Sequence, residues 1–316
     1  MISTDVDLAV ARLRAGGVVA MPTETVYGLA ADARDPAAVA RIFAIKGRPA
    51  SHPLIVHLAR PDNLTGWASS VPDDAARLAS TCWPGPLTML LPRHHDVDDA
   101  VTGGRPTVGL RVPSHPMAQQ LLSSFGGGLA APSANRFGKV SPTTAEHVLA
   151  DLGDRLDPER DLILDGGPSE VGVESTIVDL TVTPPQVLRA GAISADDLHR
   201  ILERDVAEAS GPGRASGMLA SHYAPDCEVL PVDDRDAADS LAAERRGAGE
   251  HVGVVDRTDD LVVAAQRLYG DLRDADARGL DVLIVVLPPP AGIGHAIRDR
   301  VTKAAAARSS PPSPAG

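Results

Sequence analysis

Short apolar stretches alternate with segments of helical periodicity over the first two hundred residues. Residues 5–15 place Val6, Val10 and Leu13 on one face of a helix, and an apolar strand follows at 18–21. Further strands are expected at 54–58, 87–91, 108–112, 129–131, 162–164, 175–180 and 186–189. Strands that alternate with helices are typical of an α/β fold built on a central sheet. The pattern therefore predicts the α/β class.

The alternation breaks after residue 204, and this break divides the chain. Residues 205–227 are rich in glycine and other turn-forming residues and show little periodicity, which predicts a linker. A smaller α/β domain is expected at 228–308, and the Ser/Pro-rich end at 309–316 is expected to be disordered. The strands of the smaller domain are expected at 228–232, 252–255 and 282–287. Residues 1–204 then form the larger domain.

The composition of the 316-residue chain limits the classes of protein to which it can belong. Its longest strongly apolar run, 282–287, is far shorter than the roughly 20 residues that cross a bilayer. The N-terminus lacks the pattern of a secretory signal, and Cys82 and Cys227 are too few for a disulfide framework. We therefore expect a cytoplasmic protein with no membrane partner. The net charge of -12 argues against stable nucleic-acid binding, so any anion site must be local.

Several familiar catalytic and nucleotide-binding motifs are incomplete. The segment that begins at Ser133 resembles a P-loop, but Ser133 replaces its first glycine and Val140 its metal-binding hydroxyl. Residues 211–216 are one residue short of a dinucleotide fingerprint and do not follow a strand. His52 and His57 lack the spacing of a zinc site, and no nucleophile elbow is present. The motifs therefore do not indicate covalent catalysis, and they do not identify a side chain that would bind a metal.

Polar and cationic side chains gather instead at predicted strand ends and glycine turns, where α/β sheets bind their ligands. These residues are Thr23, Thr25, Lys46, Arg48, Arg111, Ser133, Asn135, Ser175 and Arg189. Each one alone has a structural explanation, because cations neutralise helix ends and Ser or Asn form turns. Together they predict buried cations, which need anionic partners. Those partners are either carboxylates of this acidic chain or an anionic ligand.

Six short motifs follow one another in the first domain: MPTETVYGL at 21–29, KGRP at 46–49, WPGPLT at 83–88, GLRVP at 109–113, APSAN at 131–135 and ESTIVD at 174–179. In this order they resemble the Sua5/YrdC family of threonylcarbamoyl-AMP synthases. The segments at 216–225 and 292–300 resemble the long, two-domain Sua5 type. The resemblance implies a twisted open mixed sheet with helices in a YrdC-like catalytic domain, and a smaller Rossmann-like α/β C-terminal domain. It also implies that the linker folds over the active site.

The resemblance implies a nucleotidyltransferase that makes L-threonylcarbamoyladenylate and pyrophosphate from L-threonine, bicarbonate or CO2, and ATP with Mg²⁺. The product would serve the t6A modification of tRNA, so the tRNA threonylcarbamoyl-transferase machinery is the expected downstream partner. Lys46 and Arg48 are the expected catalytic residues, because they would neutralise charge on the reacting phosphates. The magnesium ion is expected to bind mainly through the ATP phosphates.

Taken residue by residue, the resemblance places two groups of ligands in one cleft. L-threonine would contact Thr25, His57, Arg111, Ser175 and the backbone of Ala131. ATP would contact Lys46, Arg48, His52, Thr107, Ser133, Asn135, Ser141, Arg189 and Tyr223. These residue types suit the substrates, because guanidinium groups and backbone amides bind carboxylates and phosphates well.

Three other functions stay open at this point. A transferase that handles carbamoyl-adenylate is disfavoured, because such enzymes carry further domains and cysteines that this chain lacks. An RNA-binding or ribosome-maturation module would need a basic face and more aromatic residues than three Phe, three Tyr and two Trp. A sensor that binds small molecules without turnover is compatible with the sequence.

Overall fold

The computed structural model describes residues 1–209 and 223–306, and the chain divides into two compact units. The first unit lies within residues 1–137 and 141–218, and the second within 138–140 and 219–316. No sequence pattern indicated that 138–140 groups with the C-terminal part of the chain. The predicted tail and residues 210–222 of the predicted linker lie outside the described residues. The domain boundaries and the folding of the linker over the active site therefore stay predictions.

One mixed sheet forms the centre of the first unit. Its strands are β1 (Ile2–Ser3), β2 (Val19–Met21), β3 (Gly28–Asp32), β4 (Ile55–His57), β5 (Leu87–Pro92), β6 (Thr107–Arg111), β7 (Leu129–Ala130), β8 (Leu162–Leu164), β9 (Thr176–Asp179), β10 (Gln186–Arg189) and β11 (Ala207–Glu208). Their order across the sheet is β1-β8-β2-β3-β7-β4-β6-β5-β9-β10-β11. Strands β4 and β6 run parallel, whereas β5 and β6 run antiparallel. The predicted mixed sheet is confirmed.

The sequence pattern does not predict strands β1, β3 and β11. Strand β3 reads Gly-Leu-Ala-Ala-Asp, and glycine, alanine and aspartate favour strands only weakly. It is nevertheless paired on both sides, with β2 and with β7, and its first four residues are buried. Pairing within the sheet thus overrides the local preference of this segment.

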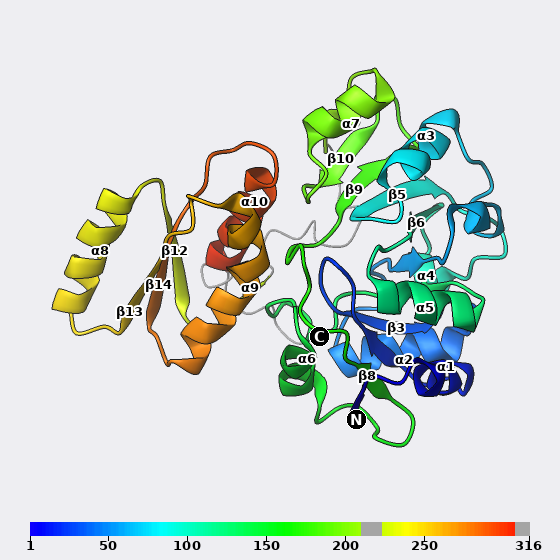
Figure 1. Ribbon diagram of the computed structural model, residues 1–316, viewed down its shortest axis with the longest axis horizontal. Coiled ribbons are helices and arrows are strands. Elements are labelled where there is room, and N and C mark those ends of the chain that lie inside the picture. Colours follow the sequence, from blue (N-terminus) through cyan, green and yellow to red (C-terminus); the bar gives the residue numbers. More distant parts are fainter. Residues whose placement is uncertain (210–222, 307–316) are drawn as a thin grey trace. The chain divides into compact units, whose positions relative to one another are not determined.

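Helices cover both faces of the sheet in the first unit. They are α1 (Val6–Arg14), α2 (Pro36–Lys46), the 3-10 helix η1 (Pro61–Gly66), α3 (Asp73–Cys82), α4 (Asp99–Thr102), α5 (Pro116–Phe125), α6 (Ala145–Leu152) and α7 (Ala195–Leu202). Side chains of β2 alternate between two cores: Val19 and Met21 share one with α1 and α5, and Ala20 shares the other with α2. Helix α3 packs against α7 (Figure 1).

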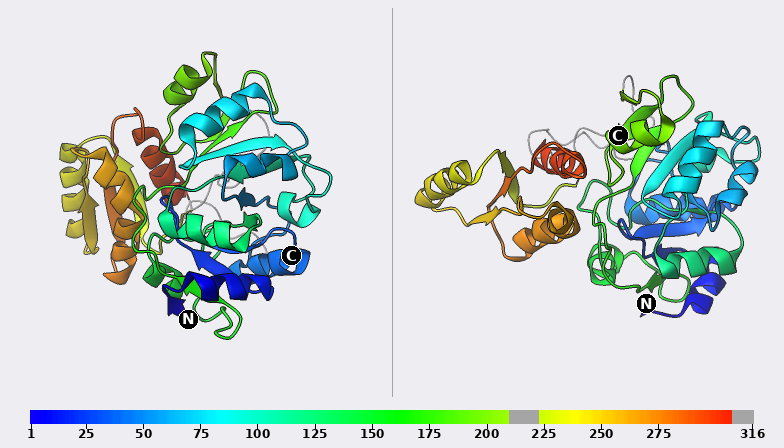
Figure 2. Two further views of the ribbon diagram at one scale, coloured as in Figure 1. Left: turned by 45° about the vertical axis from the view of Figure 1, so that its right-hand side comes forward. Right: turned by 45° about the horizontal axis from the view of Figure 1, so that its top comes forward.

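The second unit is a smaller α/β sandwich. Its parallel strands are β12 (Glu228–Val232), β13 (Val252–Val255) and β14 (Val282–Val286), in the order β12-β14-β13. Its helices are α8 (Arg235–Gly247), α9 (Leu261–Ala277) and α10 (Gly294–Ala306). Helix α8 packs through Ala238 and Ala242 on one face of the sheet, and α9 and α10 lie on the other (Figures 1 and 2). The predicted Rossmann-like α/β unit is confirmed.

Two further expectations concern the chain as a whole. Of the helices in the described ranges, none has the length and apolar character needed to cross a membrane. Cys82 and Cys227 are buried free thiols, and no disulfide joins them.

Candidate active site

Arg111 is the buried cation at the end of β6, and it contacts the segment that follows β2. Its Nη1 donates to Thr25 Oγ1 at 2.8 Å, and its Nη2 donates to Glu24 Oε1 at 2.6 Å. Glu24 Oε2 accepts from the backbone N–H of Ser114 at 3.1 Å. Arg111 and Glu24 are both buried, so this ion pair is shielded from water. Two predicted threonine ligands, Thr25 and Arg111, are therefore in direct contact.

His57 lies beside Arg111 across the parallel pair of β4 and β6. Burial, together with the Arg111 charge, lowers the pKa of the His57 imidazole to about 3, so the ring is neutral at neutral pH. Its Nδ1 has no hydrogen-bond partner within the described ranges. Ala131 lies near the same strand, because its N–H donates to Ile55 O at 2.9 Å. A neutral imidazole with one open nitrogen can form a hydrogen bond with a hydroxyl group.

Ser175 connects a predicted threonine ligand with a predicted nucleotide ligand. Its Oγ is 2.8 Å from Thr88 Oγ1, and it accepts from Arg189 Nη2 at 3.0 Å. Arg189 Nε also donates to Ser175 O at 3.0 Å. Thr88 is fully buried on β5, which pairs with β6 so that Met89 lies opposite Leu110. A predicted threonine ligand and a predicted ATP ligand are therefore hydrogen-bonded to each other.

Lys46 ends α2, where Gly47 adopts a left-handed conformation (φ 64°) that lets the chain turn. Its Nζ donates to the carbonyl oxygens of Ser133 and Asn135, at 2.6 and 2.5 Å. Lys46 is 3% exposed, and the charge of Asp151 is the acidic contribution to its pKa. Burial, followed by the charge of Arg48, lowers the pKa of Lys46 well below its usual value. An ammonium group in this setting favours an anionic ligand.

Arg48 lies in a cluster of positive groups. Its Nη2 donates to Pro53 O at 3.0 Å. Burial, followed by the charges of Arg189 and Arg105, lowers the pKa of Arg48 to about 10. Burial, followed by Arg48 and Arg105, also lowers the pKa of His52. A bound polyanion would relieve the repulsion among these groups.

Two further predicted ATP ligands are Ser141 and Thr107. Ser141 Oγ donates to Glu174 Oε1 at 2.6 Å, and both side chains are buried. Thr107 is half-buried at the start of β6, at the opposite end of that strand from Arg111. Thr107 therefore lies two residues after Arg105 and is separated from Arg111 by the length of β6.

Tyr223 lies in the second unit. Its ring stacks on that of Tyr269 with centroids 5.4 Å apart, and the Arg300 guanidinium carbon is 5.5 Å from its centroid. The side chain is 1% exposed, and its backbone adopts φ 64°. Its predicted contact with ATP stays a prediction, because the preceding residues 210–222 lie outside the described residues.

Four polar residues of these networks were missed by the sequence analysis: Glu24, Thr88, Arg105 and Glu174. A signal existed for Glu24 and Glu174, because each is an acidic residue directly beside a predicted ligand, Thr25 or Ser175. Thr88 also had a signal, because it ends the WPGPLT motif at 83–88, whereas Arg105 lies in none of the motifs.

Among the residues that the structure describes, the carboxylates and histidines near these networks form no group with the spacing of metal ligands. Within the described ranges one group has the spacing for a metal ion, His94 with His95 and Asp96, and it is partly exposed and contains no predicted site residue. The predicted nucleotide ligands are instead mostly cations and hydroxyls. This donor set fits a magnesium ion that is held mainly by ATP phosphates.

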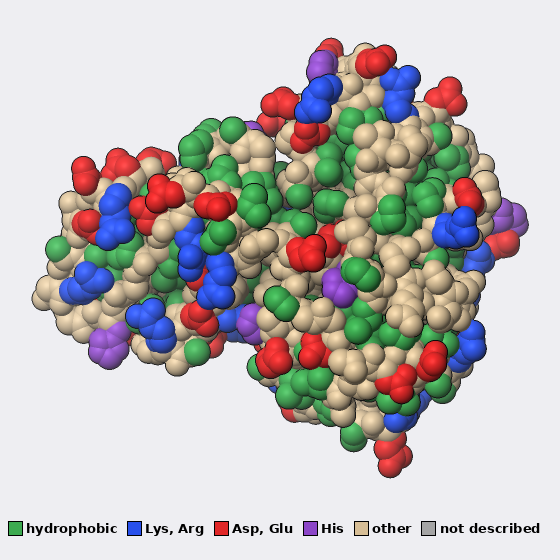
Figure 3. Space-filling model, viewed as in Figure 1, with side chains coloured by type: hydrophobic (Ala, Val, Ile, Leu, Met, Phe, Trp, Pro, Cys, Tyr) green, Lys and Arg blue, Asp and Glu red, His purple; other side chains and the backbone are tan. Residues whose placement is uncertain are grey.

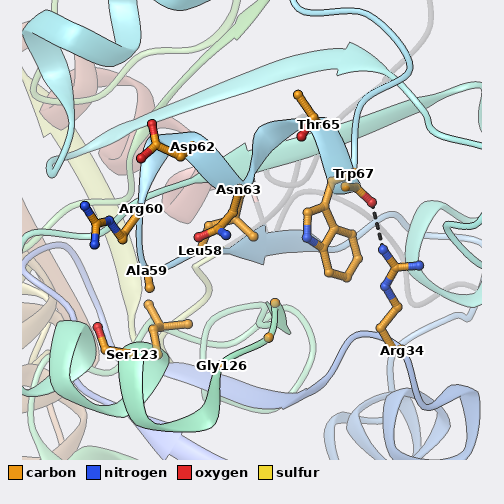
Figure 4. A pocket seen from close by; sticks show the side chains of 14 residues that line it. Arg34, Leu58, Ala59, Arg60, Asp62, Asn63, Thr65, Trp67, Ser123 and Gly126 are labelled. Atoms are coloured by element: carbon orange, nitrogen blue, oxygen red, sulfur yellow. Dashed lines mark hydrogen bonds between the residues drawn. The ribbon is translucent and has the colours of Figure 1, made fainter.

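A separate pocket of about 760 Å³ lies between η1 and the segment after α5 (Figure 4). Asp62, Asn63 and Thr65 line it, and none of the predicted site residues does. The Arg34 guanidinium at its wall donates to Gly66 O at 2.7 Å and stacks on the Trp67 ring at 4.5 Å. Arg34 therefore stabilises η1 in this pocket.

The charged surface residues are of mixed sign. On the face drawn in Figure 3, Lys and Arg side chains are interspersed with Asp and Glu among the described residues. This mixture agrees with the net charge of -12. The absence of stable nucleic-acid binding stays a prediction.

Comparison with known proteins identifies the family. Residues 11–191 match the Sua5/YciO/YrdC family model, described as "Telomere recombination", and residues 193–306 match the model described as "Threonylcarbamoyl-AMP synthase, C-terminal domain". The chain belongs to the Sua5/YciO/YrdC family. Within this family it is 38% identical to the threonylcarbamoyl-AMP synthase of Pyrococcus abyssi, over 95% of this chain and 94% of that protein. It is 37% identical to that of Bacillus subtilis, over 95% and 92%.

Solved structures of the family agree with this assignment. The crystal structure of Pyrococcus abyssi Sua5 complexed with L-threonine superposes with a TM-score of 0.90 and 38% identity, over 96% of this chain and 94% of that chain. A variant of the same Sua5 protein superposes with a TM-score of 0.91 and 35% identity, over 98% and 96%. The two-domain type of this family, expected from the sequence, is confirmed.

Proposed function

We propose that this protein is an L-threonylcarbamoyladenylate synthase, a nucleotidyltransferase that uses L-threonine, bicarbonate or CO2, and ATP. One observation carries the proposal: Ser175, a predicted threonine ligand, accepts a hydrogen bond from Arg189, a predicted ATP ligand whose charge also acts on Arg48. An amino acid and a polyphosphate can therefore bind side by side. The family membership and a threonine complex of a relative support the same function.

In the proposed reaction, Arg111 and Thr25 hold the threonine carboxylate, with His57, Ser175 and the Ala131 backbone around the rest of the amino acid. The unprotonated amine adds to CO2, so a carbamate forms and a proton is released to water. A carbamate oxygen then attacks the α-phosphorus of ATP. The bond from that phosphorus to the bridging oxygen breaks, and pyrophosphate leaves with both electrons of that bond.

The residues around ATP would provide positive charge and hold the phosphates in position. Lys46 and Arg48 would neutralise charge that develops on the phosphates, and Arg189 would link them to the threonine side through Ser175. The remaining ATP contacts are expected from His52, Thr107, Ser133, Asn135, Ser141 and Tyr223. Mg²⁺, when bound with ATP, would withdraw charge from the phosphate oxygens. The product would pass to the tRNA threonylcarbamoyl-transferase machinery for t6A formation, and we expect the enzyme to act in the cytoplasm.

Incubation with L-threonine, bicarbonate and Mg-ATP tests this function. We expect pyrophosphate release that depends on threonine, with threonylcarbamoyl-AMP detected by mass spectrometry in rapidly quenched samples. Omission of threonine is the control. Binding of threonine or ATP without turnover would favour a sensor, and retention on tRNA at physiological salt would favour an RNA-binding module.

A further inference from the structure

The Glu24 carboxylate is a polar group at this site to which the sequence analysis gave no role. Its Oε1 is 2.6 Å from Arg111 Nη2, and its Oε2 accepts from Ser114 N at 3.1 Å. Its backbone is also fixed, because the Val171 N–H donates to Glu24 O at 2.7 Å. The side chains of Glu24 and Arg111 are 4% and 5% exposed. The carboxylate is therefore held in one place from two sides.

The hydrogen bonds of Arg111 show what this arrangement leaves for a ligand. Nε donates to Gly85 O at 3.4 Å, Nη1 to Thr25 Oγ1 and Nη2 to Glu24 Oε1. A guanidinium has five N–H donors, two of them on each terminal nitrogen. Among the described residues, the second N–H on Nη1 and the second N–H on Nη2 have no partner. Two such donors match the two oxygens of a carboxylate.

We propose that Glu24 is a positioning residue, which holds the Arg111 guanidinium so that its two remaining N–H groups bind the amino-acid carboxylate. This inference rests on the proposed function and adds a residue to its threonine site. The alternative effect of Glu24 is competition, since a carboxylate already paired with Arg111 cancels the charge that attracts a second one. The two effects predict opposite changes when the charge of Glu24 is removed.

The test compares Glu24→Gln and Glu24→Asp with the wild-type protein. Glutamine keeps the shape of the side chain but removes the charge, and aspartate keeps the charge on a shorter stem. We expect Glu24→Gln to raise the KM for L-threonine about tenfold or more, as loss of one charge-assisted hydrogen bond implies, and to change the KM for ATP less than about twofold. Glu24→Asp should recover part of the threonine KM.

A ligand without the carboxylate separates positioning from general damage. L-threonine amide, used as a competitor of threonine, should bind equally to wild type and Glu24→Gln, because it lacks the group that Arg111 binds. The matched control is Glu203→Gln, which removes the same charge from an exposed pair with Arg77 at 3.4 Å. It should change neither KM. Thermal unfolding and ATP affinity report whether each variant is folded, and Glu24→Asp carries the test if Glu24→Gln is not.

The inference is overturned by an unchanged or lower threonine KM in folded Glu24→Gln, since that result means competition or no role. It is also overturned by equal losses of threonine, threonine amide and ATP binding, which indicate structural damage only. Failure of the proposed function is a different result, because the wild-type protein would then release no pyrophosphate in the presence of threonine.

Discussion

The buried cations on the two sides of the candidate active site, Arg111 and Lys46, have different hydrogen-bond partners. Arg111 pairs with the carboxylate of Glu24 and donates to the hydroxyl of Thr25, so its charge is balanced within the protein. Lys46 donates to backbone carbonyl oxygens of Ser133 and Asn135, and its pKa is lowered by burial and by Arg48. Carbonyl oxygens satisfy hydrogen bonds but carry no net charge.

This difference matches the two proposed substrates. A threonine molecule brings a single carboxylate and no large net charge, so a balanced Arg111–Glu24 pair can orient it by hydrogen bonds. A triphosphate brings several negative charges, and it is attracted by neighbouring cations that lower one another's pKa, as Arg48 does for Lys46 and Arg189 does for Arg48. The comparison therefore assigns orientation to the Arg111 side and charge neutralisation to the Lys46 side.

Removal of Arg111 should have the largest effect. Arg111→Met leaves the Glu24 carboxylate buried without its cation, so we expect a loss of about 3–5 kcal/mol in the free energy of unfolding. Chemical denaturation measures it. The double variant Arg111→Met/Glu24→Gln should recover most of the stability and none of the threonine binding. A single variant as stable as the wild type would contradict the paired state of Arg111.

Removal of Lys46 should affect catalysis and spare the fold. Lys46→Met removes a cation from the phosphate side, and we expect kcat/KM to fall by about 10²- to 10³-fold. Because burial lowers the pKa of Lys46, its charged form is disfavoured in the folded protein, so the variant should lose much less stability than Arg111→Met, the loss coming from two backbone carbonyls that no longer have this donor. Threonine affinity, measured by calorimetry, should be unchanged. A loss of stability as large as that of Arg111→Met would contradict this difference between Lys46 and Arg111.

The neutral state of His57 gives a pH-dependent prediction. Its pKa is about 3 in the folded protein and near 6.5 in the unfolded chain, so the unfolded chain binds more protons between these values. Stability that depends on neutral His57 is therefore present above pH 6.5 and is lost as the pH falls toward 3. Over this range the wild-type free energy of unfolding should fall faster than that of His57→Gln, by up to about 1.4 kcal/mol per pH unit. If the free energies of unfolding of the two proteins changed equally with pH, the lowered pKa of His57 would be contradicted.

The smallest expected effect is proton uptake when ATP binds. A polyphosphate beside Lys46 raises the lowered pKa of this ammonium group toward its ordinary value, so binding takes up a fraction of a proton where the free protein is partly deprotonated. ATP affinity should then decrease with rising pH over that range. Calorimetry in buffers of different ionisation enthalpy measures the uptake, with Lys46→Met as the control. Equal uptake in the variant would assign it to another group.

The sequence by itself determined the α/β class, the mixed sheet, most strands and the family. These properties depend on local alternation of apolar residues and on short motifs, which are visible without tertiary contacts. The residues Thr25, Lys46, Arg111 and Ser175 were accessible in the same way, because each lies in a motif at the end of an element.

Only the tertiary structure decided which charges are balanced. Glu24 and Arg111 are 87 residues apart in sequence, as are Thr88 and Ser175, and no local pattern pairs them. Strand β3 likewise forms because β2 and β7 pair with it on both sides. The physical reason is that periodicity encodes which face of an element is buried, whereas the partner and the solvation of a buried charge depend on residues brought together by folding.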